Sequence, residues 1–296
     1  HCHFLGEKKM KYKFITDNKN IYPIEKMAKV LNLSKSGYYK WLEKPISDRE
    51  IEDNKILCEI KKIHKESKST YGSPRVHNSL QTKGIKCGKN KVVRLMKENN
   101  VFSKIRKKYK ATTDSNHNNP VSENTLDRKF AVDKPNKVWV SDITYIWTLE
   151  GWLYLCFIID LFSRKVVGWS MKARMDSSLV TNAFYMAYMQ RKPERNELLF
   201  HSDRGSQYAS KEFQKVLKDK EVLSSMSRKG NCWDNACAES FVHTLKVEEV
   251  HHSIYRNREI AQVKIFEYIE GFYNNSRMHS TLGYMSPVEF EKKKIA

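Results

Sequence analysis

The order of apolar runs between residues 138 and 250 constrains the fold of this chain more than any other feature. Three runs rich in branched and aromatic residues come first, and each has the length of a strand. Helical segments then alternate with two short strands. The strands are expected at 138–146, 152–160, 165–170, 198–202 and 222–226, and the helices at 176–190, 211–220 and 235–250. This alternation predicts an α/β domain.

Three consecutive strands followed by helix, strand, helix, strand and helix is the order of an RNase H-like fold. We therefore predict an RNase H-like core over 137–252, with a mixed five-stranded sheet and flanking helices. The remaining residues, 253–296, are expected to form a helical tail. This tail has one helix at 261–273, followed by a loop.

The residues before this core have the apolar spacing of short helices. Helices are expected at 22–31, 36–42, 48–66, 75–83 and 89–100. The first two give a helix-turn-helix-like segment over 1–45, and the other three give a basic DNA-binding domain over 46–110. Residues 111–136, rich in Thr, Asn, Ser and Pro, are predicted to be a linker. The last helix of the basic domain suits a DNA major groove, although a small protein-docking domain has the same pattern.

The net charge of +20 is unevenly distributed along the chain. Residues 1–130 contain 30 Lys and Arg against 14 Asp and Glu, a net charge of +16, whereas the rest contains 24 against 20, a net charge of +4. A basic half joined to a nearly balanced half indicates a module that binds a polyanion, although solubility alone is an alternative explanation. The candidate DNA contacts in this half are Arg75, Lys89, Lys91, Arg94, Lys104, Arg106, Lys107 and Lys108.

Cysteine spacing and hydropathy exclude several classes of protein. None of the six cysteines forms a CxxC pair and no His pair has zinc-finger spacing, so a structural zinc site is not expected. No apolar run approaches the roughly 18–20 residues of a membrane span, and no signal-peptide pattern is present. We therefore expect a protein of the reducing cytoplasm, without a membrane partner.

Three acidic residues lie where a charge needs a partner or a metal. Asp142 lies in the middle of the first strand, where an unpaired charge is costly. Asp203 follows the fourth strand, and α/β folds gather ligands at the carboxyl ends of strands. Glu239 lies on the last helix of the core, in one row with His243 and Lys246 beside the apolar stripe. We expect this row to face inward along the edge of the core.

These three carboxylates together predict a metal centre. An all-oxygen ligand set suits Mg²⁺ or Mn²⁺. Two such ions, about 3.5–4 Å apart, would activate an attacking hydroxyl and stabilise the leaving oxygen of a phosphodiester. Taken singly, each residue has another explanation, because Asp142 could form a salt bridge, Asp203 could cap a helix and Glu239 could be solvated. Their convergence favours catalysis.

Other residues near the predicted centre are candidates for DNA contact. Lys246 suits a terminal phosphate or base, and its alternative role is to pair with Glu239 or solvent. Arg204 follows Asp203 directly. In the C-terminal tail, Arg277 and His279 are further candidates, with even odds between DNA contact and a structural role.

The sequence motifs around the carboxylates resemble those of bacterial insertion-sequence transposases. Asp142, Asp203 and Glu239, with the 35 residues 204–238 between the last two and Lys246 seven beyond Glu239, look like the Asp-Asp-Glu (DDE) signature of the retroviral-integrase superfamily. The motifs that carry this resemblance lie at 71–75 (Tyr-Gly-Ser-Pro-Arg), 139–145, 160–164, 201–208, 231–236 and 273–287. Over nearly its whole length the chain is similar to OrfB, the second-frame product of the third large insertion-sequence family.

This resemblance implies a Mg²⁺-dependent polynucleotidyl transferase with an integrase catalytic core. Such a transposase cleaves DNA at terminal inverted repeats and joins the exposed 3′-hydroxyls to target DNA, commonly through a circular intermediate. It usually forms the C-terminal part of a frameshift fusion, whose upstream OrfA segment supplies another helix-turn-helix and a leucine zipper. This chain has no sustained heptads, so we expect that segment outside it. The resemblance also implies a homo-oligomer that bridges two DNA ends at a bacterial nucleoid.

Four further positions receive specific interpretations. The resemblance places Asp160 near the site without a ligand role, in turn contacts with Ser163 or Arg164. His201 is more often a packed histidine than a ligand. Asp234 has the position of an N-cap of the Glu239 helix. Residues 230–233 suit either a mobile loop over the site or an ordinary loop.

Two other functions are compatible with these residues. A nuclease on the same fold would use the same carboxylates to hydrolyse nucleic acid without joining ends. A non-catalytic protein that binds the element's ends and inhibits the full-length fusion would need only the basic half. The intact set of carboxylates favours the transposase.

Overall fold

The structure is a computed structural model, and it describes residues 2–43, 47–104, 122–228 and 232–295. Its contacts divide the chain into two compact units, 1–58 and 59–296. The boundary between these two units falls inside the helix expected at 48–66. Within the described part of the chain, no helix combines the length and the hydropathy that crossing a membrane requires.

Three helices pack together in the first unit. They are α1 (Cys2–Asn18), α2 (Ile24–Val30) and α3 (Lys35–Leu42). Their contact buries Ile15, Met27, Ala28 and Tyr38. The Ser34 hydroxyl caps α3 by accepting a hydrogen bond from Gly37 N. The sequence did not predict α1, because its apolar residues are not concentrated on one side of the helix.

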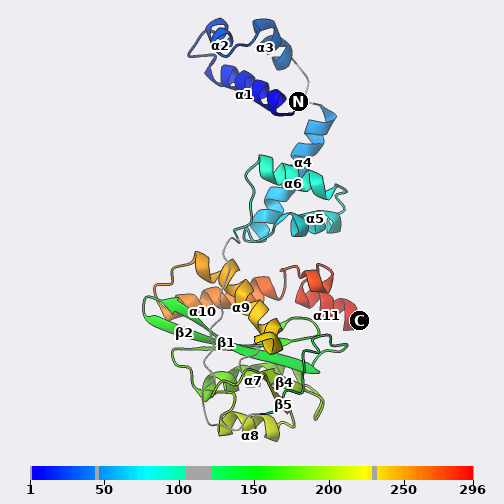
Figure 1. Ribbon diagram of the computed structural model, residues 1–296, viewed down its shortest axis with the longest axis vertical. Helices are drawn as coiled ribbons and strands as arrows, with labels where there is room; N and C mark the ends of the chain where they lie inside the picture. Colours follow the sequence, from blue (N-terminus) through cyan, green and yellow to red (C-terminus); the bar gives the residue numbers. More distant parts are fainter. Residues whose placement is uncertain (1, 44–46, 105–121, 229–231, 296) are drawn as a thin grey trace. The chain divides into compact units, whose positions relative to one another are not determined.

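Helix α4 (Asp48–Glu66) runs from the first unit into the second, where α5 (Ser73–Thr82) and α6 (Lys89–Glu98) pack against each other (Figure 1). Each helix buries one face, and the buried residues include Ile60, Ile63, Val76, Leu80, Val92 and Leu95. All three helices were predicted from apolar spacing, with ends within about two residues of those observed.

Five strands form one sheet in the order β3-β2-β1-β4-β5. They are β1 (Val138–Thr148), β2 (Gly151–Asp160), β3 (Val166–Lys172), β4 (Leu199–Ser202) and β5 (Leu223–Met226). Strand β2 is antiparallel to both β1 and β3, whereas β4 is parallel to β1 and β5 is parallel to β4. The predicted mixed five-stranded sheet is therefore confirmed.

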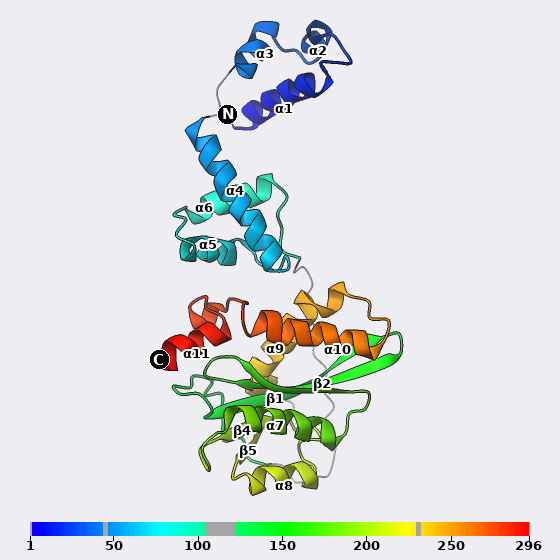
Figure 2. The ribbon, with the colours of Figure 1, turned by 180° about the vertical axis from the view of Figure 1, so that it is seen from behind.

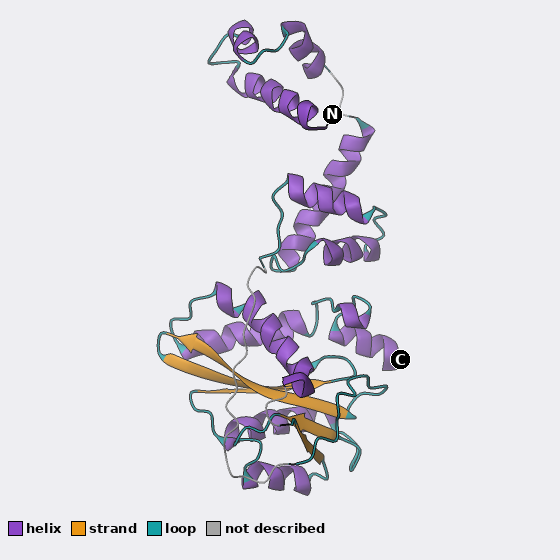
Figure 3. Cartoon of the chain, in the orientation of Figure 1, coloured by secondary structure: helices purple, strands orange, loops and turns teal. Residues whose placement is uncertain are grey.

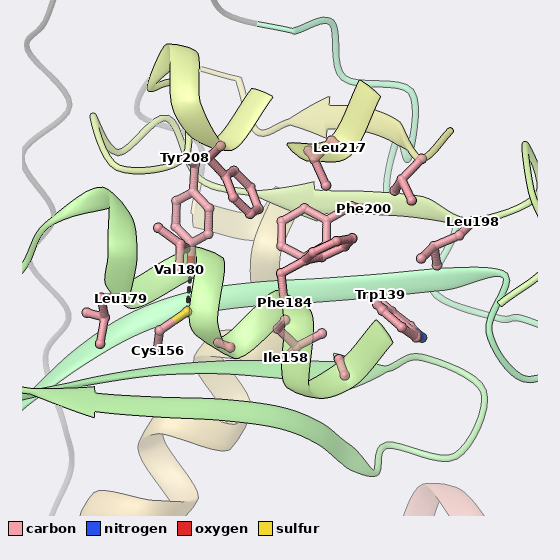
Figure 4. Packing of buried hydrophobic residues seen from close by; sticks show 14 of the residues in the cluster. Trp139, Cys156, Ile158, Leu179, Val180, Phe184, Leu198, Phe200, Tyr208 and Leu217 are labelled. Atoms are coloured by element: carbon pink, nitrogen blue, oxygen red, sulfur yellow. Dashed lines mark hydrogen bonds between the residues drawn. The ribbon is translucent and has the colours of Figure 1, made fainter. Parts of the chain in front are cut away.

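Helices cover both faces of this sheet. Helices α7 (Ser177–Arg191) and α8 (Lys211–Asp219) lie on one side, and α9 (Ala236–Glu248) and α10 (Arg258–Phe266) lie on the other (Figures 2 and 3). On the first side, Trp139, Phe184 and Phe200 belong to one large buried cluster (Figure 4). On the second side, Phe157 meets Phe241 of α9 with a ring-centroid distance of 4.5 Å. The sheet is thus buried on both faces at its centre.

The chain after α9 is more helical than predicted. Helix α10 continues into a π-helical segment, Glu267–Tyr273, and the two together correspond to the predicted helix. Helix α11 (Pro287–Ile295) occupies residues predicted to be a loop. It begins with a capping box, in which Ser286 N donates to the Glu289 carboxylate at 2.8 Å and Glu289 N donates to Ser286 Oγ at 3.3 Å. Short 3₁₀ turns lie at Cys232–Asn235, Val250–His252 and Ser280–Leu282.

Residues 122–136, which the sequence placed in a linker, lie against the sheet. The Ser225 hydroxyl on β5 accepts hydrogen bonds from Thr125 N at 3.0 Å and from Leu126 N at 3.3 Å. Leu126 is buried. The polar composition of this segment predicted a linker. In the structure, its polar groups instead form hydrogen bonds with groups of the sheet. Residues 105–121 of the predicted linker lie outside the described residues.

The contact between β3 and α7 gives a test of this packing. A Cβ at Gly168 would lie 2.4 Å from Ala183 O and 2.7 Å from Ala187 Cβ. We expect Gly168→Ala to lower the free energy of unfolding by roughly 1–3 kcal/mol, because backbone must shift. In the control Gly271→Ala, the added Cβ meets nothing within 4 Å, so stability should be unchanged or about 0.5–1 kcal/mol higher. Equal losses in urea denaturation would contradict the close packing.

Candidate active site

Asp142 and Asp203 become neighbours because β1 and β4 are parallel. The register pairs Val140 of β1 with His201 of β4. Continuing it by two residues places Asp203, immediately after β4, level with Asp142. Level residues on adjacent strands point to the same face and are separated by about 4.8 Å between strands. The parallel pairing therefore presents both carboxylates at one face.

The Asp142 carboxyl group lies where a negative charge is unfavourable. Burial is the largest cause of its raised pKa, the negative charge of Asp203 is the next, and that of Glu239 acts in the same direction. A hydrogen bond from Ile143 N at 2.8 Å and the positive charge of Lys246 lower the pKa, but the net pKa stays well above the ordinary value. These surroundings therefore disfavour the charged form of the Asp142 carboxyl group.

Glu239 reaches this site on α9, whose buried stripe packs on the sheet. The stripe consists of Ala238, Phe241, Val242 and Leu245. Glu239 is half-buried beside it, and burial raises the pKa of its carboxyl group. Along the same row, Lys246 is buried but His243 is exposed. The expected inward orientation of the row is thus right for Lys246 and wrong for His243, because the row follows the boundary between core and solvent.

Lys246 lies between the acidic site and an aromatic ring. Its Nζ is 4.4 Å from the centroid of the Tyr145 ring. Burial is the main cause that lowers its pKa, and the negative charge of Asp142 opposes this effect. A buried ammonium group at this position attracts anions, because water screens its charge poorly.

The chemistry of the three carboxylates fits a hard divalent cation. All their donor atoms are oxygens, and the repulsion that raises the pKa of Asp142 is what a cation would remove. Among the described residues, however, no three His, Cys, Asp or Glu side chains are arranged to hold a metal ion together.

His201 is a packed histidine, as predicted. Its ring nitrogens lie 2.9 Å from the Ser225 hydroxyl and 3.1 Å from the Ser227 hydroxyl. Burial lowers its pKa to about 4, so the ring is neutral near pH 7. The His201 side chain therefore connects β4 to β5, two residues before Asp203.

Asp160 forms a turn contact of the predicted kind and has further partners on other elements. Its carboxylate accepts hydrogen bonds from Asn136 N at 2.9 Å and from the Arg191 guanidinium at 3.0 Å. Arg164 contacts only its backbone carbonyl, and the Ser163 hydroxyl donates elsewhere, to a carboxylate of α11. The predicted turn contact with Arg164 is therefore present at the backbone, at 2.8 Å. The carboxylate also accepts a hydrogen bond from Phe162 N within the turn at 3.1 Å.

Asp234 does not cap α9. The N-cap residue is Asn235, whose side chain makes no capping hydrogen bond. Instead, the Asp234 carboxylate accepts hydrogen bonds from Arg228 Nε and Arg128 Nε, both at 2.9 Å, which hold its pKa far below the usual range. The N-cap prediction is wrong because a 3₁₀ turn precedes α9 and shifts the cap by one residue. Residues 229–231 of the predicted loop lie outside the described residues.

The predicted DNA contacts of the basic half differ in exposure. Lys89 is exposed, whereas Lys91, Arg94 and Lys104 are half-buried. Arg204, beside the acidic site, donates from Nε to a backbone carbonyl at the end of β5 at 2.6 Å. Each of these residues keeps part of its side chain accessible. The candidates outside the described residues are Arg106, Lys107 and Lys108.

Arg75 and Arg277, both proposed from sequence as DNA contacts, meet at a buried carboxylate. Glu248, at the end of α9, is 1% exposed, and Arg277 donates to its two oxygens at 2.8 and 2.9 Å. The Tyr268 hydroxyl donates to it at 2.8 Å, and Arg75 lies 3.7 Å from it. DNA contact is therefore wrong for the buried Arg277, and Arg75 directs its charge inward.

Glu248 was missed, although the sequence contains a signal for it. It lies three residues after Leu245 and seven after Phe241, so it continues the buried stripe of α9. An acidic residue on an apolar stripe indicates a buried partner. His279 nearby is also internal, because its ring packs edge-to-face on Tyr273 at 4.9 Å and burial lowers its pKa.

Comparison with known protein families matches three regions of the chain. The sequence model of the family described as "Integrase core domain" matches residues 132–232, and a second integrase core domain model matches 239–295. A model described as "HTH-like domain" matches 50–109.

Named relatives match nearly the whole chain. It is 40% identical over 289 residues to the transposase InsF for insertion sequence IS3A of Escherichia coli K12, covering 97% of this chain and 100% of the relative. It is 44% identical over 267 residues to an uncharacterized 31 kDa protein of insertion element IS600 from Shigella sonnei, covering 90% and 98%.

Solved structures of viral origin are similar at lower identity. A chain of the simian T-cell lymphotropic virus intasome matches with a TM-score of 0.46 and 15% identity, covering 78% of this chain and 73% of the other. The HTLV-2 integrase catalytic core domain in complex with magnesium matches with a TM-score of 0.41 and 17% identity, covering 53% and 96%.

Acidification tests the role of Asp234. Because two arginines lower its folded pKa below the usual 3.8, its contribution to stability is complete above that value and is lost as pH falls toward the folded pKa. The difference in unfolding free energy between wild type and Asp234→Asn should be largest near pH 7 and shrink between about pH 5 and 2. Urea denaturation at several pH values measures it. A difference that stays constant over this range would contradict the assignment.

Removing Arg277 tests the buried ion pair. Arg277→Ala leaves Glu248 buried without its main cation, so we expect a loss of roughly 3–5 kcal/mol of unfolding free energy. Arg277→Lys, which keeps the charge but loses the bidentate contact, should cost less. The control Lys264→Ala removes an exposed pair with Glu267 and should cost at most about 1 kcal/mol. Unchanged stability with weaker DNA binding would support the original prediction instead.

Proposed function

The chain belongs to the IS3 family of insertion-sequence transposases, and from this premise we propose that it cleaves DNA at the ends of an insertion sequence and joins the exposed 3′ ends to target DNA. The observation that supports this most directly is the position of Asp142, whose pKa is raised first by burial and then by the negative charges of Asp203 and Glu239. Such a cluster is unfavourable for folding, so its presence favours a catalytic role.

We propose Asp142, Asp203 and Glu239 as the catalytic residues and as ligands of two divalent cations, Mg²⁺ or Mn²⁺. Bound there, such ions would supply Lewis-acid chemistry, which lowers the pKa of an attacking hydroxyl and stabilises a leaving oxygen. The chain itself supplies one carboxylate on β1, one directly after β4 and the third on α9. The scissile phosphodiester is proposed to lie at these three carboxylates.

Lys246 is proposed to bind a phosphate of the DNA end. Its ammonium group lies beside Asp142, and its burial strengthens attraction to an anion. Arg204 follows Asp203 and is proposed as a second contact to the backbone of the DNA. With both cations in place, the phosphodiester can approach a site that otherwise repels it.

The basic helices are proposed to supply most of the affinity for DNA. Lys89 and Lys91 begin α6, the last helix of the HTH-like region, and Lys104 and Arg94 extend the positive charge. We also propose a homo-oligomer that joins two inverted-repeat ends, an OrfA segment as fusion or partner, and a location at the bacterial nucleoid. The charge of +20 supports the DNA partner.

A nuclease of the same fold is the second candidate, because its carboxylates would be the same. The product separates the two: a transposase yields joined strands, whereas a nuclease yields only fragments. A non-catalytic inhibitor of the fusion would bind the ends and yield neither.

Glu239→Gln is the decisive variant. The purified protein, with the element's own end on a labelled oligonucleotide and Mg²⁺, is expected to give strand-transfer products in wild type. The variant should lose at least about 10³-fold in rate, because a metal ligand loses its charge. Its affinity for the same DNA in EDTA should stay within about twofold, because the half-buried Glu239 makes no favourable contact with phosphate.

Exposed acidic residues away from the site provide the matched control. Glu212→Gln on α8 removes the same charge and is expected to leave strand transfer unchanged. Strand transfer by Glu239→Gln at the wild-type rate would defeat the assignment of the site. If the wild-type protein yields DNA fragments but no joined strands, the nuclease becomes the better proposal.

A further inference from the structure

The far half of the β1–β2 hairpin extends beyond strands β4 and β5. Strand β4 pairs with β1 only from Val138 to Val140, whereas β2 pairs with β1 as far as Thr148. Among the described residues, no strand pairs with the other edge of β1 between Asp142 and Trp147. The hairpin therefore presents an open edge that begins at the acidic site.

Three aromatic rings occupy one face of this hairpin. Tyr145, Trp147 and Trp152 are 39%, 55% and 43% exposed, and we call them the aromatic surface. Trp147 lies directly opposite Trp152 in the strand register. The ring centroids of Tyr145 and Trp152 are 5.1 Å apart and those of Trp147 and Trp152 are 4.8 Å apart, both edge-to-face. Rings held by paired strands in this way form a rigid surface that is ready for a partner.

This surface adjoins the proposed catalytic carboxylates. Tyr145 and Trp147 lie three and five residues from Asp142 along one strand, which corresponds to roughly 10 and 17 Å. Although Asp142 and Tyr145 point to opposite faces, Lys246 connects them, because its Nζ is 4.4 Å from the Tyr145 ring and its charge acts on Asp142. A strand of DNA at the carboxylates can therefore pass the open edge and reach the rings within a few nucleotides.

The charges around the rings suit a polyanion. Lys246 lies at the Tyr145 end. At the other end, Tyr154 pairs with Lys172, the last residue of β3, and the exposed Arg174 follows two residues later along the chain. A second copy of this chain is a poor partner for this surface, because its net charge of +20 would repel these cations. The phosphates of DNA would neutralise them instead.

We propose that the aromatic surface stacks unpaired bases of the DNA end that is processed at the carboxylates. This rests on the proposed function, because it assigns the substrate of the same site an unpaired terminal segment. Bases inside a duplex are already stacked on their neighbours, so only unpaired bases offer a free face to Tyr145 or the tryptophans. Stacking of this kind tolerates any base sequence.

The test compares two duplexes of the same arbitrary sequence, one fully paired and one with its last three base pairs replaced by mismatches. Binding is measured by fluorescence anisotropy in EDTA, so that no chemistry occurs. Wild type is expected to bind the mismatched duplex more tightly. Trp147→Ala should lose this preference, with roughly 5- to 150-fold weaker binding of the mismatched duplex, and Trp147→Phe should keep most of it.

The control Tyr185→Ala removes an aromatic ring of similar exposure, 41%, on α7, and should leave the preference unchanged. Equal thermal unfolding of all variants shows that the fold is intact. A wild-type preference retained by Trp147→Ala overturns the proposal. So does a change of oligomeric state in sedimentation without a change of preference, because the rings would then join copies of the chain.

This binding test is independent of catalysis. A preference that depends on Trp147 but accompanies no strand transfer by wild type would reject the proposed function and retain the stacking surface. Strand transfer without any preference for mismatched ends would reject only the stacking surface. The Glu239→Gln protein should show the same preference as wild type.

Discussion

Repulsion between neighbouring carboxylates is the constraint on which the second unit depends. Asp142 lies on β1, Asp203 directly follows the neighbouring parallel strand β4, and Glu239 adds a third negative charge from α9. Such a cluster destabilises the folded chain, so the surrounding structure must hold it together against the repulsion. The sheet holds its strands in place through backbone hydrogen bonds, which form whatever the charge of the side chains.

Helix α9 is fixed at both ends by buried acidic residues. Before its first turn, Asp234 is held by Arg228 and Arg128, which tie it to β5 and to the segment before the sheet. In its last turn, Glu248 is held by Arg277 from the C-terminal region. Because buried carboxylates without partners are costly, these contacts fix the helix in position. Glu239 lies between the two anchors, so its approach to the aspartates is set by contacts distant from it.

The sequence predicted most elements because apolar spacing reports burial on one face. The five strands and the helices α4 to α9 follow directly from it. Helix α1 lacks a one-sided pattern, and α11 is marked by a capping box, Ser286 to Glu289, that apolar spacing does not reveal. The roles of polar residues were harder to predict from the sequence. The same side chain can cap a helix, pair across elements or contact DNA, and local sequence does not distinguish these roles, as Asp234 and Arg277 demonstrate.

The residues proposed to carry the chemistry can be recognised from local pattern, because one carboxylate lies in mid-strand, another at a strand end and a third beside a helical stripe. Which charges meet depends on the packing of the folded chain. It paired Arg277 with Glu248, brought Lys246 between Asp142 and the Tyr145 ring, and left that ring on an open edge with two tryptophans. The physical reason is that electrostatic partners are chosen by distance in space, and residues far apart in the chain become neighbours only when the sheet and its helices pack.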